Sequence, residues 1–590
     1  MAASIESTTK KQTATPDAAK TSRRATLLLL SSQHLITVLV SIGLALVALL
    51  PRLLLARQLD EVTDEIVYIS GGKLYLSLIA SHDITSGQWL VNHEHPPLVK
   101  ILIGTSIVLN NLIGHPLGEL MAGRLPSVIM GTLLVLGIYW LGRAPFGKKI
   151  AQIAALALAV SPWLAYFSAL AYLDMTMATF VTLAYLLLWH AIKRPWLYPV
   201  VTLLIGLGAA SKYPAALAIP AIVLFIAYYY FVLRPKLPIE QRPAFPWRWW
   251  AIAFIVAPLG FLLADPAIWP QPVARLLSSF AFEATHSKSG HLVFLDNHIL
   301  THVPIWTSDY TIFIKMSSFL TIPAVFFCIF ALVKVIRFHL NPSQIEVTQI
   351  SRHAYLLIWL IGTLAMFSLL NIAVGTHYYL PVTPPVAIAG VAGLAVLLHY
   401  LTNLIWKKSI HSLDIPTPAS DQDPHIGSKN PGMQLHILIP AILLAILAIA
   451  PHLLGLSTVY AAEGYTSELF QNNENQRLQV AYPGYREALQ WLASHSQDHA
   501  RVGLIGSSLN GGGLSVNWFT YNPTLNQRFQ LKQIDVTDKD FKYIPSSFQG
   551  YTYLIWPTNL KQRGYPWPAG YHHIYSITGG QTIYCDILTT

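Results

Sequence analysis

A series of apolar runs, each long enough to cross a lipid bilayer, recurs along this chain as far as about Leu456. A transmembrane helix needs about 20 predominantly apolar residues. The runs expected to be transmembrane helices are His34–Leu55, Leu125–Leu141, Ile150–Ser168, Met175–Ile192, Pro199–Ala210, Ala215–Leu233, Trp250–Leu263, Ile312–Ile336, Ala354–Ala373, Pro381–Leu401 and Leu435–Leu456. The pattern therefore predicts an all-α polytopic membrane bundle of about eleven transmembrane helices.

Composition supports this fold class and divides the chain into three parts. Only 11% of the residues are charged, whereas soluble domains carry about 25%. Residues 1–25 are small and polar, and we expect a disordered cytoplasmic tail there, followed by a membrane domain over 26–457. Polar residues return over 458–590, where a soluble α/β domain is expected. Its predicted elements are a helix at Tyr485–His495 and strands at Arg501–Ile505, Tyr551–Trp556, His573–Ile577 and Thr582–Leu588.

The net charge of +10 is distributed between the apolar runs. Lysine and arginine concentrate in the cytoplasmic loops of membrane proteins. Alternate loops hold the groups Arg143/Lys148/Lys149, Lys193/Arg194, Arg234/Lys236/Arg242/Arg248, Lys334/Arg337/Arg352 and Lys407/Lys408/Lys429. This distribution predicts a cytoplasmic N-terminus and an extracytoplasmic C-terminal domain in a cytoplasmic membrane, and it gives no reason to expect nucleic-acid binding. The shorter apolar stretch Ile101–Ile113 is then an interfacial or re-entrant helix of the first outer loop.

That first outer loop opens with four carboxylates within six positions: Asp60, Glu61, Asp64 and Glu65. A carboxylate beside low-dielectric surroundings can act as a general base when a cation or hydrogen bonds keep it ionised. The same residues also suit a helix start, with Thr63 as N-cap and acidic residues in the first turn. The two interpretations are compatible, because a cap fixes the carboxylates in place.

Further motifs follow this acidic cluster in a fixed order. They are His95-Pro96-Pro97-Leu98 with Lys100, Arg124-Leu125-Pro126-Ser127, Tyr172-Leu173-Asp174, and His377-Tyr378-Tyr379-Leu380-Pro381. In this order the chain resembles the GT-C glycosyltransferases over roughly 36–401. Within them it is most similar to the protein O-mannosyltransferase and lipid A aminoarabinose transferase branch.

The resemblance implies an inverting transfer of a sugar from a polyprenyl-phosphate donor to a hydroxyl of a protein, lipid or glycan acceptor outside the membrane. It assigns the acidic cluster to catalysis, with Asp64 as the base and Glu65 in acceptor or cation contacts. Asp60 stays open as the rival base, because a spacing of four places it on the same helical face as Asp64.

The resemblance also implies two sets of binding residues. The residues expected to bind the donor phosphate are Lys100, Arg124, Lys212, His377 and Tyr378, and those expected to bind substrate are Tyr68, His95 and Asp174. A cation is needed to stabilise the departing phosphate. Two alternatives stay open: Lys212 could snorkel to the headgroups, and Asp174 could cap the following helix.

No cofactor is firmly predicted, although the third outer loop has side chains that could hold a divalent cation. These are His286, Ser287, Lys288, Ser289, His291, Asp296, His298 and His302, whose spacing fits no zinc pattern. Two other classes of function remain: a multi-pass transporter and a membrane-anchored binding protein. The sequence has no evident internal repeat of the kind that marks inverted-repeat transporters.

Overall fold

Long helices in a membrane-spanning bundle make up most of the protein. The computed structural model describes residues 16–62, 64–289, 293–341, 347–370, 375–405, 431–458, 461–471, 474–506, 523–535 and 548–590. Within these ranges, nine helical segments are long and apolar enough to cross a membrane, and a bent helix pair makes a tenth. The protein is therefore a multi-pass membrane protein.

The membrane-spanning elements occupy the positions that hydropathy predicts. They are α1 (Pro16–Gln58), α4 (Glu119–Leu141), α6 (Lys148–Ala159) with α7 (Pro162–Ser168), α8 (Asp174–Lys193), η3 (Tyr213–Leu217) with α10 (Ala218–Ala227) and η4 (Tyr228–Leu233), α11 (Trp247–Ala264), α14 (Ser318–Leu340), α15 (Val347–Leu370), η9 (Thr376–Val382) with α16 (Thr383–Ile405), and α17 (Pro431–Thr458). The expected span at 199–210 is α9 (Tyr198–Ser211), a shorter apolar helix. Helix α1 begins at Pro16, earlier than the predicted end of the N-terminal tail at residue 25.

Two of the predicted spans are broken. The run 150–168 bends by 62° between α6 and α7, because Pro162 has no N–H to donate and its ring clashes with the preceding turn. The run 312–336 begins within α13 (Thr307–Lys315) and restarts at α14. Ser317 separates the two helices and caps α14 by accepting a hydrogen bond from the Phe319 N–H.

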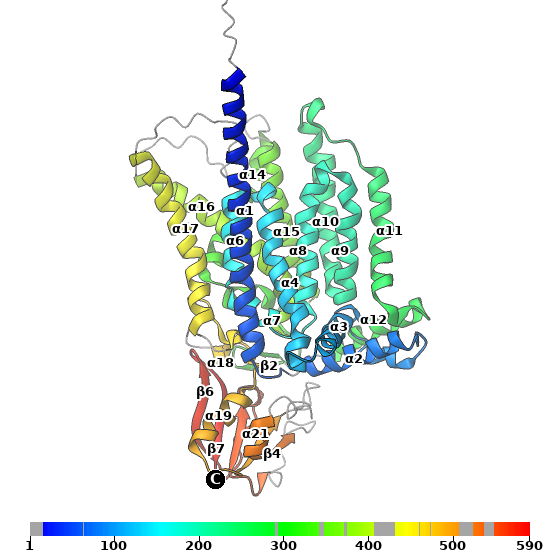
Figure 1. The fold of residues 1–590 in the computed structure, drawn as a ribbon, viewed down its shortest axis with the longest axis vertical. Coiled ribbons are helices and arrows are strands. Elements are labelled where there is room, and N and C mark those ends of the chain that lie inside the picture. The colour runs from blue at the N-terminus through cyan, green and yellow to red at the C-terminus, as the bar shows by residue number, and fades with distance from the viewer. Residues whose placement is uncertain are drawn as a thin grey trace, which may run out of the picture.

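Interfacial helices in the first loop, as expected, lie across one end of the bundle. They are α2 (Glu65–Ala80) and α3 (Leu98–Leu112), and the C-terminal domain lies at the same end (Figure 1). Helices α2 and α3 cross at Gly72 and Gly104. A Cβ on either glycine would overlap the backbone of the other helix, so only glycine permits this close approach.

The C-terminal domain is a five-stranded mixed sheet in the order β4-β3-β5-β7-β6. Its strands are β3 (Arg501–Gly506), β4 (Gln530–Asp535), β5 (Tyr553–Pro557), β6 (His572–Gly579) and β7 (Thr582–Thr589). Strand β3 pairs in parallel with β4 and β5, whereas β7 pairs antiparallel with β5 and β6. Helix α19 (Tyr485–His495) buries Tyr485, Ala488, Leu489 and Leu492, the spacing of one helical face. The predicted α/β fold is confirmed.

Shorter elements connect these parts. They are η1 (Gly87–Leu90), α5 (Arg143–Phe146), η2 (Pro195–Leu197), η5 (Arg234–Lys236), η6 (Ile239–Gln241), η7 (Pro266–Ile268), α12 (Pro272–Ser289), β1 (Val293–Leu295), β2 (His298–Leu300), η10 (Ala462–Gly464), α18 (Glu474–Arg477), α21 (Pro523–Arg528) and α22 (Thr558–Gln562). The expected linker over 409–433 lies almost wholly outside the described residues, and so does Thr63.

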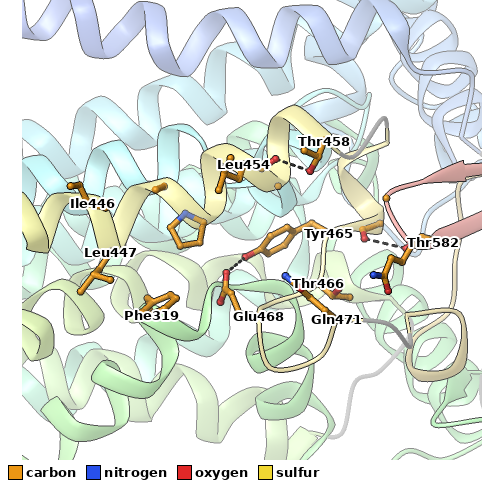
Figure 2. A pocket seen from close by; sticks show the side chains of 16 residues that line it. Phe319, Ile446, Leu447, Leu454, Thr458, Tyr465, Thr466, Glu468, Gln471 and Thr582 are labelled. Carbon is orange, nitrogen blue, oxygen red and sulfur yellow. Dashed lines mark hydrogen bonds between the residues drawn. The ribbon is translucent and has the colours of Figure 1, made fainter.

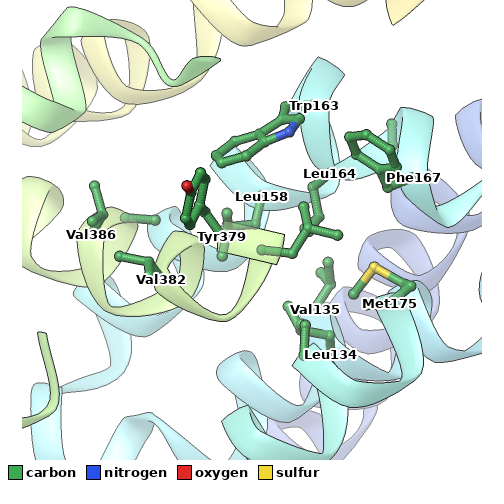
Figure 3. Close-up of a cluster of buried hydrophobic side chains, with 14 of the residues drawn as sticks. Leu134, Val135, Leu158, Trp163, Leu164, Phe167, Met175, Tyr379, Val382 and Val386 are labelled. Atoms are coloured by element: carbon green, nitrogen blue, oxygen red, sulfur yellow. The ribbon is translucent and has the colours of Figure 1, made fainter. Parts of the chain in front are cut away.

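Large apolar side chains pack together inside the bundle. Figure 3 shows Trp163 and Phe167 of α7, Met175 of α8 and Tyr379 of η9 gathered around Leu164. All five are buried. This cluster packs the break between α6 and α7 against the start of α8 and against η9, the segment that precedes α16.

Replacing Gly72 with Ala is expected to lower the stability of the protein by roughly 1–3 kcal/mol, the range for overpacking a tight contact. The added methyl would meet the backbone of Lys100 and Gly104. The measurement is thermal unfolding of the purified protein in detergent. Gly87→Ala is the control, because a Cβ there meets nothing within 4 Å. An unchanged midpoint for Gly72→Ala would contradict the close helix crossing.

Candidate active site

A buried arginine organises the turn between α1 and α2. Arg124 of α4 donates from Nε and Nη2 to the Glu65 carboxylate at 2.7 and 2.5 Å. Its Nη1 donates to the carbonyls of Ala56 and Leu59 at 2.7 and 2.8 Å, and Nη2 also donates to that of Asp60 at 2.8 Å. All five guanidinium N–H groups are therefore used. This geometry does not support the predicted role of Arg124 as a ligand of the donor phosphate.

Both carboxylate oxygens of Glu65 are likewise fully used in hydrogen bonds. Besides Arg124, its carboxylate accepts the backbone N–H of Val62 at 2.9 Å and that of Ala171 at 2.8 Å. Its side chain is fully buried. Glu65 thus ties the start of α2 to the segment before α8, and its four hydrogen bonds favour a positioning role over the predicted contact with acceptor or cation.

Asp60, the rival base, binds the C-terminal domain. Its carboxylate accepts the Arg486 backbone N–H at 3.1 Å and forms an ion pair with the Arg486 guanidinium at 3.3 Å. The Asp60 N–H donates to the Tyr482 hydroxyl at 3.0 Å. Because Asp60 is fully buried in these contacts, it anchors the loop to the C-terminal domain, and Asp64 is the better candidate for the base.

Lys100 holds the second half of the loop. Its ammonium donates to the Asn92 carbonyl, the Asn92 side chain and the His95 carbonyl at 2.7–2.8 Å. Burial lowers the pKa of Lys100 to about 7, although Glu94 and Asp265 act in the opposite direction. With its three donors occupied, Lys100 fixes the turn that carries His95, and this geometry does not support its predicted contact with the donor phosphate.

Lys212 and Asp174 form a second buried ion pair, and this one is incompletely satisfied. The Lys212 ammonium lies 2.7 Å from Asp174 Oδ1 and 3.6 Å from the centre of the Tyr378 ring. Both charged side chains are at most 2% exposed. Asp174 Oδ2 accepts no hydrogen bond from any described residue. Since buried polar groups are normally satisfied, the pair is suited to meeting a polar ligand.

A chain of ring contacts joins this ion pair to the first loop. Tyr68 lies 6.1 Å from His95 and 5.9 Å from Tyr172 between ring centroids. Tyr172 lies 5.6 Å from His377, which contacts Tyr378 at 4.9 Å. Burial raises the pKa of Tyr68 and lowers that of His95, so both rings are neutral near pH 7. The chain brings the predicted residues Tyr68, His95, His377 and Tyr378 together.

Asp64 stands at the edge of this cluster, directly before α2 and partly exposed. Burial raises the pKa of the Asp64 carboxyl to about 6. The charge of Lys212 opposes this rise, and Asp174, Glu65 and Glu94 add to it. The Asp64 side chain caps no backbone N–H. A carboxyl with a pKa near neutrality, electrostatically coupled to a buried lysine, is poised for general-base chemistry.

Sequence reasoning missed one member of this cluster as a site residue, Tyr172. Its ring bridges Tyr68 and His377, and burial raises its pKa. The available signal was its position two residues before Asp174. For the loop over 286–302, no group of three or more potential metal ligands occurs among the residues that the structure describes. The side chains of His286, Ser287, Lys288 and Ser289, and the whole of His291, lie outside them.

A comparison with known protein families finds a match over a segment that contains several of these site residues. Residues 94–239 match the family model described as dolichyl-phosphate-mannose-protein mannosyltransferase. The chain is similar to that family over these residues. The matched segment includes His95, Lys100, Arg124, Asp174 and Lys212, and it bears out the resemblance that the motifs indicated. No curated protein matches the sequence.

Solved structures give weaker likenesses. ArnT from Cupriavidus metallidurans bound to undecaprenyl phosphate is 15% identical, with a TM-score of 0.43 over 94% of this chain and 98% of that one. The Archaeoglobus fulgidus oligosaccharyltransferase tethered with an acceptor peptide is 15% identical, with a TM-score of 0.45 over 93% of this chain and 73% of that one.

Replacing Arg124 with Met is expected to destabilise the protein by about 3–5 kcal/mol, because it leaves the buried Glu65 carboxylate without its positively charged partner. The measurement is thermal or denaturant unfolding in detergent. Lys73→Met is the matched control. It breaks the Lys73–Glu119 pair, whose side chains are 47% and 35% exposed, and such pairs contribute about 1 kcal/mol or less. Equal effects of the two substitutions would refute the organising role of Arg124.

Proposed function

We propose that this protein is an integral membrane glycosyltransferase that moves a sugar from a polyprenyl-phosphate donor to an acceptor hydroxyl, with inversion at the anomeric carbon. The observation that carries the proposal is the convergence of Asp64 with the Lys212–Asp174 pair. These residues come from three separate parts of the sequence, and the charge of Lys212 acts on the Asp64 carboxyl. The matching family, whose name specifies a lipid-phosphate sugar donor, supports the same class of reaction.

In the proposed reaction, Asp64 accepts the proton of the acceptor hydroxyl as its oxygen attacks the anomeric carbon. The bond from that carbon to the phosphate oxygen breaks, and the electron pair leaves with the polyprenyl phosphate. One displacement of this kind inverts the configuration. A pKa of about 6 leaves most of Asp64 ionised at pH 7 while keeping it basic enough to take a proton.

Lys212 provides the positive charge that the departing phosphate requires. Asp174 holds its ammonium from one side, and Tyr378 lies against another. A cation held in a site of low dielectric stabilises developing negative charge more strongly than the same cation in water does. In this proposal, His377 and Tyr378 line the phosphate side, whereas Tyr68, His95 and Tyr172 form the wall against the sugar.

We further propose that this site faces the outside of a cytoplasmic membrane and that the N-terminus lies inside. The basic residues Arg234, Lys236, Arg242 and Arg248 fall in the loop between η4 and the start of α11, at the other end of the bundle from the C-terminal domain (Figure 1). Such loops stay in the cytoplasm.

A reporter fused after Thr590 tests this orientation. Alkaline phosphatase, which needs an oxidising compartment, is expected to be active there, and a cytoplasmically folding fluorescent protein is expected to stay dark. The same reporters placed between Lys236 and Arg242 should give the reverse result. A fluorescent C-terminal fusion with inactive phosphatase would overturn the proposed orientation.

Asp64→Asn is expected to lower sugar transfer by about 10²–10⁴-fold, the contribution of a general base. The assay incubates purified protein with radiolabelled polyprenyl-phosphate sugars and a membrane extract. In the wild type, transfer should rise about tenfold per pH unit up to about pH 6 and then level off, because only ionised Asp64 can accept the proton.

Asp83→Asn is the control for this substitution, since Asp83 is an exposed carboxylate in the same loop. It should transfer at the wild-type rate. Unfolding midpoints show whether both variants fold. A folded Asp64→Asn protein with full activity would refute the assigned base. If the wild type transfers no sugar from any donor, and uptake or ligand binding survives Asp64→Asn, the protein is a transporter or a binding protein instead.

A further inference from the structure

A groove of about 440 Å³ lies between α14, α17 and the C-terminal domain, where it is lined by residues outside the candidate active site. Figure 2 shows Leu447 of α17 next to Phe319 of α14, with Ile446 and Leu454 further along the same stretch of α17 and the Tyr465 hydroxyl directed at Glu468. The complete lining is Phe319, Ile446, Leu447, Ala450, Pro451, Leu454, Gly455, Thr458, Gly464, Tyr465, Thr466, Glu468, Gln471, Gly580, Gln581 and Thr582.

One half of the groove is apolar and belongs to the lipid-facing surface. Phe319, Ile446 and Leu454 are 40%, 53% and 63% exposed, and all three lie on membrane-spanning helices. Side chains of this kind on a membrane span contact lipid tails. The apolar half is therefore continuous with the hydrocarbon layer, and an acyl chain can lie along it without leaving the membrane.

The other half is polar and begins where the spans end. Helix α14 starts at Ser318 and α17 ends at Thr458, which places Thr466, Gln471 and Gln581 just beyond the hydrocarbon, at the depth of lipid headgroups. The groove therefore has a two-zone lining that matches the tail and the headgroup of a membrane lipid.

A fixed carboxylate stands between the two zones. Glu468 Oε2 accepts the Ser318 N–H at 2.7 Å, and Oε1 accepts the Tyr465 hydroxyl at 3.2 Å. Glu468 is the only charged residue in the lining given above, and that lining contains no lysine, arginine or histidine. The charge of the groove thus favours a headgroup with a positive group and disfavours one whose only charge is negative.

We propose that this groove binds one phospholipid with a primary-ammonium headgroup, of the phosphatidylethanolamine class. The ammonium would donate to Glu468, the glycerol and phosphate oxygens would meet the amides and hydroxyls of the polar half, and one acyl chain would follow Phe319 and Ile446. A choline headgroup has the same charge but no N–H to donate. A glycerol headgroup has a negatively charged phosphate and no positive group, and the lining offers no lysine, arginine or histidine to pair with that phosphate.

The test is native mass spectrometry of the full-length protein after exchange into an equimolar mixture of phosphatidylethanolamine, phosphatidylcholine and phosphatidylglycerol. The wild type should retain one phosphatidylethanolamine with a preference of about fivefold over each of the others, the ratio that corresponds to about 1 kcal/mol, the net contribution of one hydrogen bond. Ala450→Phe, which fills the apolar half, should abolish this retention. Leu453→Phe adds the same ring to a lipid-facing residue outside the lining and should leave retention intact.

Glu468→Gln supplies an independent readout, because it removes the charge and keeps an oxygen to accept the Ser318 N–H. It should equalise retention of phosphatidylethanolamine and phosphatidylcholine. The proposal is overturned if the wild type retains the three lipids equally or prefers phosphatidylglycerol. It is also overturned if folded Ala450→Phe retains phosphatidylethanolamine as the wild type does. None of these outcomes depends on sugar transfer.

Discussion

The buried pair of Arg124 and Glu65 is the interaction on which the organisation of the site depends. The cost of desolvating both charges is recovered only when every donor and acceptor finds a partner, and here the five guanidinium donors and the two carboxylate oxygens all do. The pair joins α4, the end of α1, the start of α2 and the segment before α8. Because these hydrogen bonds immobilise Glu65, the neighbouring residue Asp64 is held in place directly before α2.

The Arg124–Glu65 and Lys212–Asp174 ion pairs therefore differ in character. In the Arg124–Glu65 pair every hydrogen-bond donor and both carboxylate oxygens have partners, so this pair stabilises the structure. In the Lys212–Asp174 pair, Asp174 Oδ2 accepts no hydrogen bond from any described residue. The C-terminal domain contributes to the first pair indirectly, since Arg486 and Tyr482 bind Asp60, whose carbonyl accepts from Arg124. The C-terminal domain is thus part of the scaffold that positions the first loop.

Hydropathy located the membrane segments, since burial in lipid demands long apolar runs wherever the chain crosses. It did not locate the breaks at Pro162 and Ser317, because a short polar interruption hardly changes the average over a window. In the C-terminal domain, α19 and four strands were predicted, whereas β4 was missed. Its sequence, Gln-Leu-Lys-Gln-Ile-Asp, is that of a strand at a sheet edge, where half the side chains meet water.

By itself, the sequence determined the membrane class, the α/β nature of the C-terminal domain and the set of polar residues from which a site could be built, because each of these follows from local composition and spacing. Only the tertiary structure decided which of those residues hold the fold together and which belong to the candidate site. Arg124 and Glu65 are consumed by hydrogen bonds to each other and to backbone groups far away in the sequence. Lys100 is consumed by hydrogen bonds to the nearby Asn92 and His95, while Asp64, Asp174 and Lys212 are brought together beside a chain of aromatic rings. A charge can be assigned to structure or to chemistry only when its partners are known, and those partners are set by the packing of helices that the linear pattern does not specify.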